Sequence, residues 1–139
     1  MAARILVIDG QGGGLGRQLV AALAAACPEA ELIAVGTNSL ATSAMLKAGA
    51  ARGATGENAV IVNSRRADVI VGPLGIVVAD ALLGEITPAM AAAVSESRAQ
   101  KVLIPVNRCS VTVVGVAELP LGEYVRLAVQ AAKEQLEEK

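Results

Sequence analysis

Short apolar runs alternate with longer stretches of helical periodicity along the chain. Residues 4–9, 31–36 and 101–106 are nearly uninterrupted apolar runs. Runs of this length are typical of parallel strands that helices cover on both faces. We therefore expect these three runs to be buried strands of a parallel sheet.

Apolar residues recur at helical spacing in four stretches, residues 14–27, 39–48, 88–97 and 121–136. The first helix should stop just before Pro28, because the residue that precedes a proline avoids the α region. Gly49 suits the end of the second helix, and Thr87 followed by Pro88 provides a cap and a first helical residue for the third. The last stretch has a single apolar stripe, which is typical of a helix packed on a sheet.

The remaining segments carry weaker patterns. Residues 59–62 and 67–72 are interpreted as two short strands, and residues 111–116 as another strand. Residues 76–83 are ambiguous between strand and helix, because β-branched residues occupy a helix-length position, and a helix is favoured.

Strands and helices alternate at these lengths over the whole sequence, which predicts one fold class. We expect a single Rossmann-like domain over residues 1–139: an α/β fold in three layers, with a doubly wound, mostly parallel sheet. The polar, glycine-containing stretch 53–58 would then connect a helix to a strand. It should lie at the edge of the sheet opposite the first strand–helix turn, as a candidate subunit contact.

Composition limits the class of protein further. The chain has 139 residues, of which 54% are hydrophobic and 18% charged, and its mean hydropathy is +0.56. This is more apolar surface than a small monomer easily hides, so we expect a homo-oligomer. The longest apolar run, residues 69–79, is too short to span a membrane, and no signal peptide is recognisable, so a cytoplasmic protein is expected.

Charge and the rare residue types exclude other partners. The net charge is −1 and Tyr124 is the one aromatic residue, which offers neither a basic surface nor a stacking platform for nucleic acid. Cys27 and Cys109 lack the spacing of a metal site and the sequence has no histidine, so neither a structural metal nor a disulfide is expected.

A glycine cluster follows the first strand and precedes the first helix. Four glycines fall within five positions, at 12–14 and 16, directly after Asp9, Gly10 and Gln11. Glycines let a bulky anion approach the backbone, and the start of a helix offers free N–H groups and the positive end of its dipole. A strand, a glycine turn and a helix together predict a phosphate-binding loop for a nucleotide-type ligand.

The spacing of the glycines distinguishes among the known types of phosphate-binding loop. Leu15 stands where a G-x-G-x-x-G fingerprint starting at Gly10 needs its last glycine, and Arg17 stands where a Walker loop needs lysine. The positions of Gly10, Gly14 and Gly16 instead resemble the G-x-x-x-G-x-G loop of short-chain dehydrogenases/reductases. That family's Tyr-x-x-x-Lys pair is missing, because Ala128 follows Tyr124 at the lysine position.

Other residues complete the predicted site at the carboxyl ends of the strands. Thr37 and Asn38 stand where a site for NAD commonly has an acidic residue, so neutral side chains near Arg17 favour NADP over NAD. Asp9 would repel a pyrophosphate unless it caps backbone N–H groups or meets a cation. The predicted ligand-binding residues are Gly10, Gln11, Gly12, Gly13, Gly14, Leu15, Gly16, Arg17, Thr37, Asn38, Gly72, Pro73, Gly75 and Asn107.

Two further groups are weighed as catalytic candidates and set aside. Cys109 could be a nucleophile, but no histidine can serve as its base. Glu57 or Glu85 could be an acid, but unpaired carboxylates near turns are usually solvated.

Longer stretches of the sequence resemble a known but uncharacterised family. Residues 7–14, 36–38, 41–50, 53–58 and 84–88 are similar to an uncharacterised bacterial family of unknown function. The resemblance implies a small Rossmann-like protein and carries no activity. Three hypotheses stay open: a module that binds NADP or NAD, an enzyme or sensor for a phosphorylated metabolite that uses the same loop, and a structural assembly protein with a vestigial loop.

Overall fold

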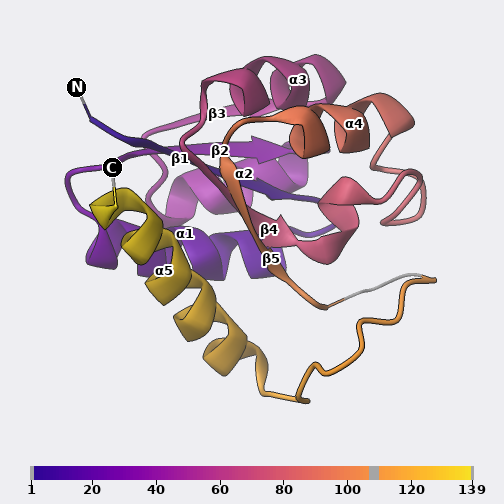
Figure 1. The fold of residues 1–139 in the computed structure, drawn as a ribbon. Coiled ribbons are helices and arrows are strands. Elements are labelled where there is room, and N and C mark those ends of the chain that lie inside the picture. The colour runs from indigo at the N-terminus through magenta and orange to yellow at the C-terminus, as the bar shows by residue number, and fades with distance from the viewer. Residues whose placement is uncertain (1, 107–109, 139) are drawn as a thin grey trace.

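The computed structural model describes residues 2–106 and 110–138. Its elements follow one another in the order β1 (Arg4–Asp9), α1 (Gly14–Ala26), β2 (Glu31–Gly36), α2 (Ser39–Ala48), β3 (Arg52–Thr55), α3 (Glu57–Arg66), β4 (Val69–Pro73), the 3₁₀ helix η1 (Leu74–Val77), α4 (Pro88–Glu96), β5 (Gln100–Ile104) and α5 (Leu121–Glu137). The five strands form one parallel sheet in the order β3-β2-β1-β4-β5. This is the Rossmann-like α/β fold that the sequence predicts, and Figure 1 shows its arrangement.

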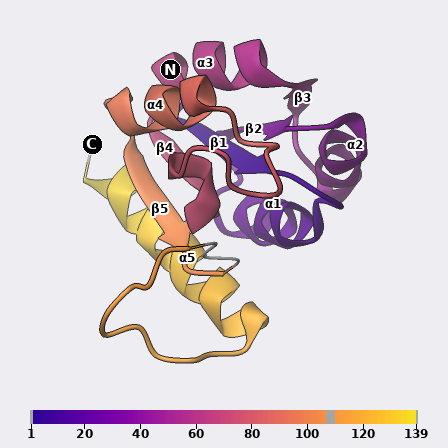
Figure 2. The ribbon, with the colours of Figure 1, turned by 90° about the vertical axis from the view of Figure 1, so that its right-hand side faces the viewer.

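Helices cover both faces of the sheet, so the fold has three layers. Helices α1, α2 and α5 lie on one face, and α3 and α4 lie on the other (Figure 2). Alternation along β1 divides the core, because Ile5 and Val7 pack with the first group of helices while Leu6 and Ile8 pack with the second. Burial on both faces explains why residues 5–8 are all apolar.

Most of the elements predicted from sequence are confirmed. Strands β1 and β2 have the predicted bounds, and α1 ends one residue before Cys27. The side chain of Thr87 accepts a hydrogen bond from the backbone N–H of Met90 at 3.1 Å, so the predicted start of α4 is also confirmed. Local signals such as caps and prolines therefore locate these ends well.

Three sequence interpretations are wrong. Residues 59–62 belong to helix α3, where Val60 packs into the core, so a β-branched run here is helical. Residues 74–77 form a 3₁₀ helix and residues 79–85 form turns, in place of the helix favoured over residues 76–83. Residues 111–116, which the sequence predicts to be a strand, pair with no strand of the sheet.

The stretch 53–58 also lies elsewhere than expected. Its first residues form strand β3, and Gly56 and Glu57 lead from the end of this strand into α3. Because all strands are parallel, this turn lies at the carboxyl edge of the sheet, the same edge as the glycine loop. The prediction that it lies at the opposite edge is wrong because β3 begins seven positions earlier than the predicted strand at residue 59.

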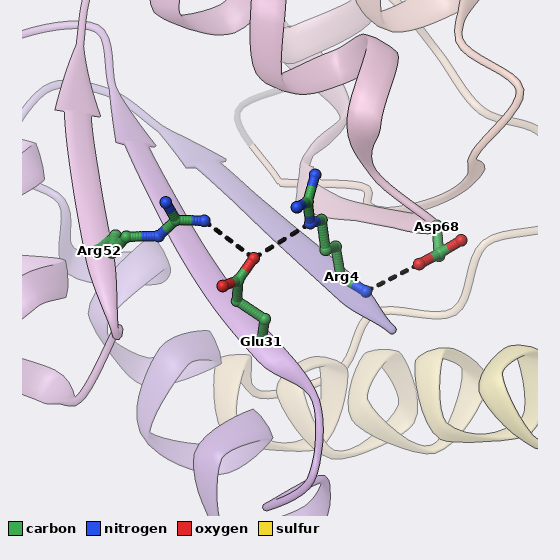
Figure 3. Close-up of polar contacts among 4 residues, drawn as sticks. All are labelled: Arg4, Glu31, Arg52 and Asp68. Carbon is green, nitrogen blue, oxygen red and sulfur yellow. Dashed lines mark hydrogen bonds and ion pairs between the residues drawn. The ribbon is translucent and has the colours of Figure 1, made fainter. Parts of the chain in front are cut away.

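The amino edge of the sheet carries a network of charged side chains (Figure 3). The Glu31 carboxylate contacts the Arg4 guanidinium at 3.1 Å and the Arg52 guanidinium at 2.9 Å, and the backbone N–H of Arg4 donates to Asp68 at 2.8 Å. These contacts join the starts of β1, β2 and β3 to the residue before β4. The side chains of the ion pairs are between 31% and 63% exposed, so each ion pair contributes at most about 1 kcal/mol.

No helix within residues 2–106 or 110–138 combines the length and apolar character needed to cross a bilayer.

Candidate functional site

The glycine loop borders the main candidate cavity, of about 530 Å³, at the carboxyl edge of the sheet. One wall is the loop itself, from Asp9 to Leu15. The opposite wall comes from the chain after β5 and from the start of α5, and its side chains are mostly apolar. The complete lining is Asp9, Gly10, Gln11, Gly12, Gly13, Gly14, Leu15, Gln18, Val106, Leu119, Leu121 and Tyr124.

Three glycines of the loop are required by close packing. A Cβ atom on Gly13 would lie 2.9 Å from the Cα of Ala41, and Gly13 also has a φ of +75°. A Cβ atom on Gly16 would lie 2.6 Å from the sulfur of Met45. One on Gly10 would lie 2.9 Å from a carboxylate oxygen of Glu85. These glycines let the loop approach its neighbours, and they need no ligand to explain them.

Close packing does not explain the glycines at positions 12 and 14. A Cβ atom on either would have no heavy atom within 4 Å, and neither has a positive φ. Both are exposed and line the cavity. The space beside them would be filled by side chains at these positions, so the glycines keep the backbone accessible from the cavity.

The backbone N–H groups of the loop fall into two sets. Gln11 donates to Glu85 at 2.8 Å, Gly13 donates to the carbonyl of Gly10 at 2.9 Å, and Gly16 donates to Asp9 at 2.7 Å. The N–H groups of Gly12, Gly14 and Leu15 take no partner in the part of the chain that the structure describes. These three unpartnered donors beside a cavity are suited to an anion.

Asp9 caps the start of α1 from the end of β1. Its side chain is buried and accepts a hydrogen bond from the backbone N–H of Gly16, which is the first of the two alternatives, a cap or a cation, that the sequence left open for this carboxylate. Burial raises the pKa of Asp9, against the lowering effect of the hydrogen bonds from Gly16 and Gly10, and the nearby Glu85 carboxylate raises it further. A negative charge at this helix start stabilises the helix but weakens its attraction for a second anion.

Glu85 lies against the loop from the segment between η1 and α4. One of its carboxylate oxygens accepts hydrogen bonds from the backbone of Gln11, the hydroxyl of Thr37 and the side-chain amide of Asn38. The hydrogen bond from Thr37, with those from Gln11 and Asn38, lowers the pKa of Glu85 against a smaller raising effect of burial. The expectation of an unpaired, solvated Glu85 carboxylate is wrong, because three donors pair with it, whereas the expectation that Glu85 is not catalytic stays a prediction.

The predicted site residues therefore divide into groups. Gly10 to Leu15 line the cavity together. Gly16 is buried beneath the loop and Arg17 is exposed on the next turn of the helix. The remaining predicted residues do not line this cavity, namely Thr37 and Asn38, which hold Glu85, and Gly72, Pro73 and Gly75, which are buried at the end of β4 and in η1.

Two sequence candidates, Asn107 and Cys109, lie outside the described residues. Gly72 needs no ligand either, because a Cβ atom there would lie 2.5 Å from the carbonyl oxygen of Ile8 on the neighbouring strand.

Thr37 and Asn38 do not provide the neutral surroundings that the sequence predicts for a 2′-phosphate. Both side chains donate to a carboxylate, so a negative charge stands at the end of β2. The expectation of neutral surroundings is therefore wrong, because an acidic residue reaches this position from a distant segment, and the preference for NADP over NAD loses its basis.

Sequence reasoning missed the apolar wall of the cavity. Leu119, Leu121 and Tyr124 line it, and the hydroxyl of Tyr124 donates to the carbonyl of Ala117, which ties the segment before α5 to the helix. The apolar stripe of α5 could have indicated which face packs on the sheet, but not that the start of the helix would face the glycine loop.

The fold and the glycine loop define a small Rossmann-like α/β domain. The chain belongs to a family described as Domain of unknown function (DUF3842), whose model matches residues 4–137. The family resemblance noted in the sequence is thus confirmed, and the domain is one of unknown function.

Structural similarity adds little beyond the fold. A crystal structure of a universal stress protein in complex with cAMP has 22% sequence identity and a TM-score of 0.41, over 75% of this chain and 98% of that one. A dodecameric FMN-dependent Ubix-like decarboxylase from Escherichia coli O157:H7 has 20% identity and a TM-score of 0.44, over 94% and 76%. Neither likeness is close enough to support an argument about ligands. Curated protein sequences give no match.

Proposed function

We propose that this domain binds the phosphate group of a nucleotide-type ligand at Gly12, Gly14 and Leu15. The observation that supports the proposal is the pair of glycines with no packing reason, beside three backbone N–H groups without a partner among the described residues. Backbone donors at a helix start are a common way to hold phosphate without a basic side chain.

The shape of the cavity extends this proposal to the rest of the ligand. From the loop, the cavity continues toward Leu119, Leu121 and Tyr124. A polar end that suits an anion and an apolar wall that suits a flat ring are the two features that a nucleotide requires. In the proposed complex, the base or another ring lies along this wall.

Calorimetric titration of the purified protein tests the proposal, with AMP, FMN, NAD, NADP, coenzyme A and inorganic phosphate as probes. Wild-type protein should bind at least one of these, and Gly12→Val should weaken binding at least tenfold without lowering the melting temperature. Gly122→Ala is the matched control, because Gly122 also has open surroundings and an ordinary φ but does not line the cavity. Absence of binding by all six probes, or equal binding by Gly12→Val, would contradict the proposal.

A homo-oligomer is a second part of the proposal. It is supported by exposed apolar side chains, which a monomer would leave in water, at Leu40, Leu46, Leu83 and Val114. Light scattering on the purified protein would measure its mass, and a monomer at all concentrations would contradict this part.

A further inference from the structure

The segment at residues 78–87, here called the Glu85 loop, has an unusual backbone. Asp80, Leu82 and Leu83 have φ values of +66°, +56° and +56°, and Gly84 follows at +88°. Residues other than glycine rarely adopt left-handed conformations, and clusters of them persist only where the surrounding structure compensates their cost.

Two contacts compensate the cost of this backbone. The side chain of Leu82 is buried, and one of its methyl carbons lies 2.9 Å from the place that a Cβ atom on Gly10 would occupy. Three residues later, Glu85 accepts its hydrogen bonds from Gln11, Thr37 and Asn38. The left-handed turn therefore brings an apolar and an acidic side chain down onto the ends of β1 and β2.

A second hydrogen bond from the side-chain amide of Asn38 strengthens this arrangement. The side-chain amide of Asn38 donates to Glu85 at 2.9 Å and also to the backbone carbonyl of Gln11 at 2.9 Å. Asn38 additionally caps α2, because its side-chain oxygen accepts from Ala41 at 2.9 Å. Glu85 is thus connected to two rigid elements, the glycine loop and the start of α2.

The position of Glu85 determines what can lie across the edge of the sheet. In Rossmann-type sites a dinucleotide extends from the glycine loop over the end of β2, where an acidic residue binds its ribose. Here the side chains of Thr37 and Asn38 after β2, and the backbone N–H of Gln11 in the glycine loop, already donate to Glu85. The Glu85 loop also packs directly on Gly10. The cavity leads the other way, toward α5.

We propose that Glu85 is a specificity-determining residue that restricts the glycine loop to ligands with a terminal phosphate, of the nucleoside monophosphate class, and excludes dinucleotides. This inference rests on the proposed phosphate site at Gly12 and Gly14. Dinucleotides are excluded by charge and by volume. The Glu85 carboxylate repels a second phosphate, and the packed Glu85 loop occupies the space that a second nucleoside needs.

The test compares each mononucleotide with a dinucleotide that contains it, AMP with NAD and FMN with FAD, by calorimetry. Wild-type protein should bind the mononucleotide of at least one pair at least tenfold more tightly than its dinucleotide. Glu85→Ala should reduce that preference at least tenfold, chiefly through tighter dinucleotide binding. Glu85→Gln keeps an acceptor oxygen and removes the charge, so it should reduce the preference for the mononucleotide at least threefold. This variant also tests the proposal if Glu85→Ala does not fold.

Glu57→Gln is the matched control. Glu57 is exposed at the start of α3, at the same edge of the sheet, and its substitution should leave the preference unchanged. Equal binding of both members of each pair by wild-type protein, or an unchanged preference in the Glu85 variants, would overturn this inference and leave the phosphate site standing. Absence of binding by every probe to wild-type protein and variants would overturn the phosphate site and this inference together.

Discussion

The glycine loop has a packed side, toward α2 and the Glu85 loop, and an open side, toward α5. On the packed side, Gly10, Gly13 and Gly16 each lie so close to a neighbour that a Cβ atom would have to displace it. On the open side, Gly12 and Gly14 have no neighbour at that distance. A glycine-rich sequence can therefore have two causes, close packing of the fold and access for a ligand, and the three-dimensional arrangement distinguishes them.

Hydrogen bonding divides the loop in the same way. Carboxylates of Asp9 and Glu85 accept the N–H groups of Gly16 and Gln11 on the packed side. The donors at Gly12, Gly14 and Leu15 lack partners among the described residues. The protein's own anions thus complete one half of the loop, and the proposed phosphate would complete the other half.

The largest effect should come from the packed side. Gly13→Ala combines a left-handed φ with a Cβ atom 2.9 Å from the backbone of Ala41, so it should lower the free energy of unfolding by about 3 kcal/mol. Urea denaturation followed by circular dichroism measures this change. A loss below about 0.5 kcal/mol would show that the loop moves away from α2 at little cost.

The next largest effect should be on ligand affinity, when the charge of Asp9 is removed. Asp9→Asn keeps an oxygen that can accept from Gly16, but it removes a negative charge from the wall of the cavity. Binding of the best phosphorylated probe should tighten by about tenfold, because like-charge repulsion is removed. Calorimetry at low and high salt checks this, and an unchanged affinity at low salt would argue that phosphate does not approach Asp9.

Glu85 should make stability depend on pH. The lowered pKa of Glu85 means that its contribution is fully present above its ordinary value of 4.5 and is lost as the pH falls through the lower value in the folded protein. Glu85→Gln should therefore be less stable than wild type by about 1 kcal/mol at pH 7, and this difference should shrink below pH 4.5.

The raised pKa of Asp9 has little effect on the stability difference between wild type and Glu85→Gln. Burial raises the pKa of Asp9, so its ionisation costs stability as the pH rises above its ordinary value of 3.8. Because Asp9 is present in both proteins, its direct contribution largely cancels in the difference. A difference between wild type and Glu85→Gln that stays constant from pH 7 to pH 3 would contradict the role of the ionised carboxylate.

The smallest effect on stability should come from the open side. Gly12→Ala should leave the free energy of unfolding unchanged or raise it by about 0.5 kcal/mol, because alanine fits the observed backbone and restricts the unfolded chain. Thermal denaturation of Gly12→Ala and Gly13→Ala under the same conditions tests this difference. If Gly12→Ala were as destabilising as Gly13→Ala, the division of the loop into two sides would be wrong.

Elements whose signals are local could be predicted from the sequence alone. The apolar run of β1, the proline after α1 and the cap at Thr87 lie within or next to the elements that they define, and the structure confirms each of them. Alternation of such elements was also sufficient to predict the parallel sheet in three layers. The glycine loop, as a feature between a strand and a helix, belongs to the same class of local signals.

Elements without a local signal were decided by packing. Val60 and its β-branched neighbours suggested a strand, but burial of Val60 against the sheet from helix α3 outweighs their weak local preference. Residues 111–116 have the composition of a strand, yet a strand requires a partner for its backbone, and the sheet supplies none to them.

The surroundings of the glycine loop depend on tertiary contacts between segments that are distant in the sequence. Glu85 is separated from Gln11 by 74 positions, and no periodicity, cap or spacing in the sequence connects the two. Leu119 and Tyr124 reach the other side of the loop because α5 packs beside α1 on one face of the sheet. The sequence predicts the loop from neighbouring residues, whereas the charge and the space around it arise from segments that meet only when the chain folds.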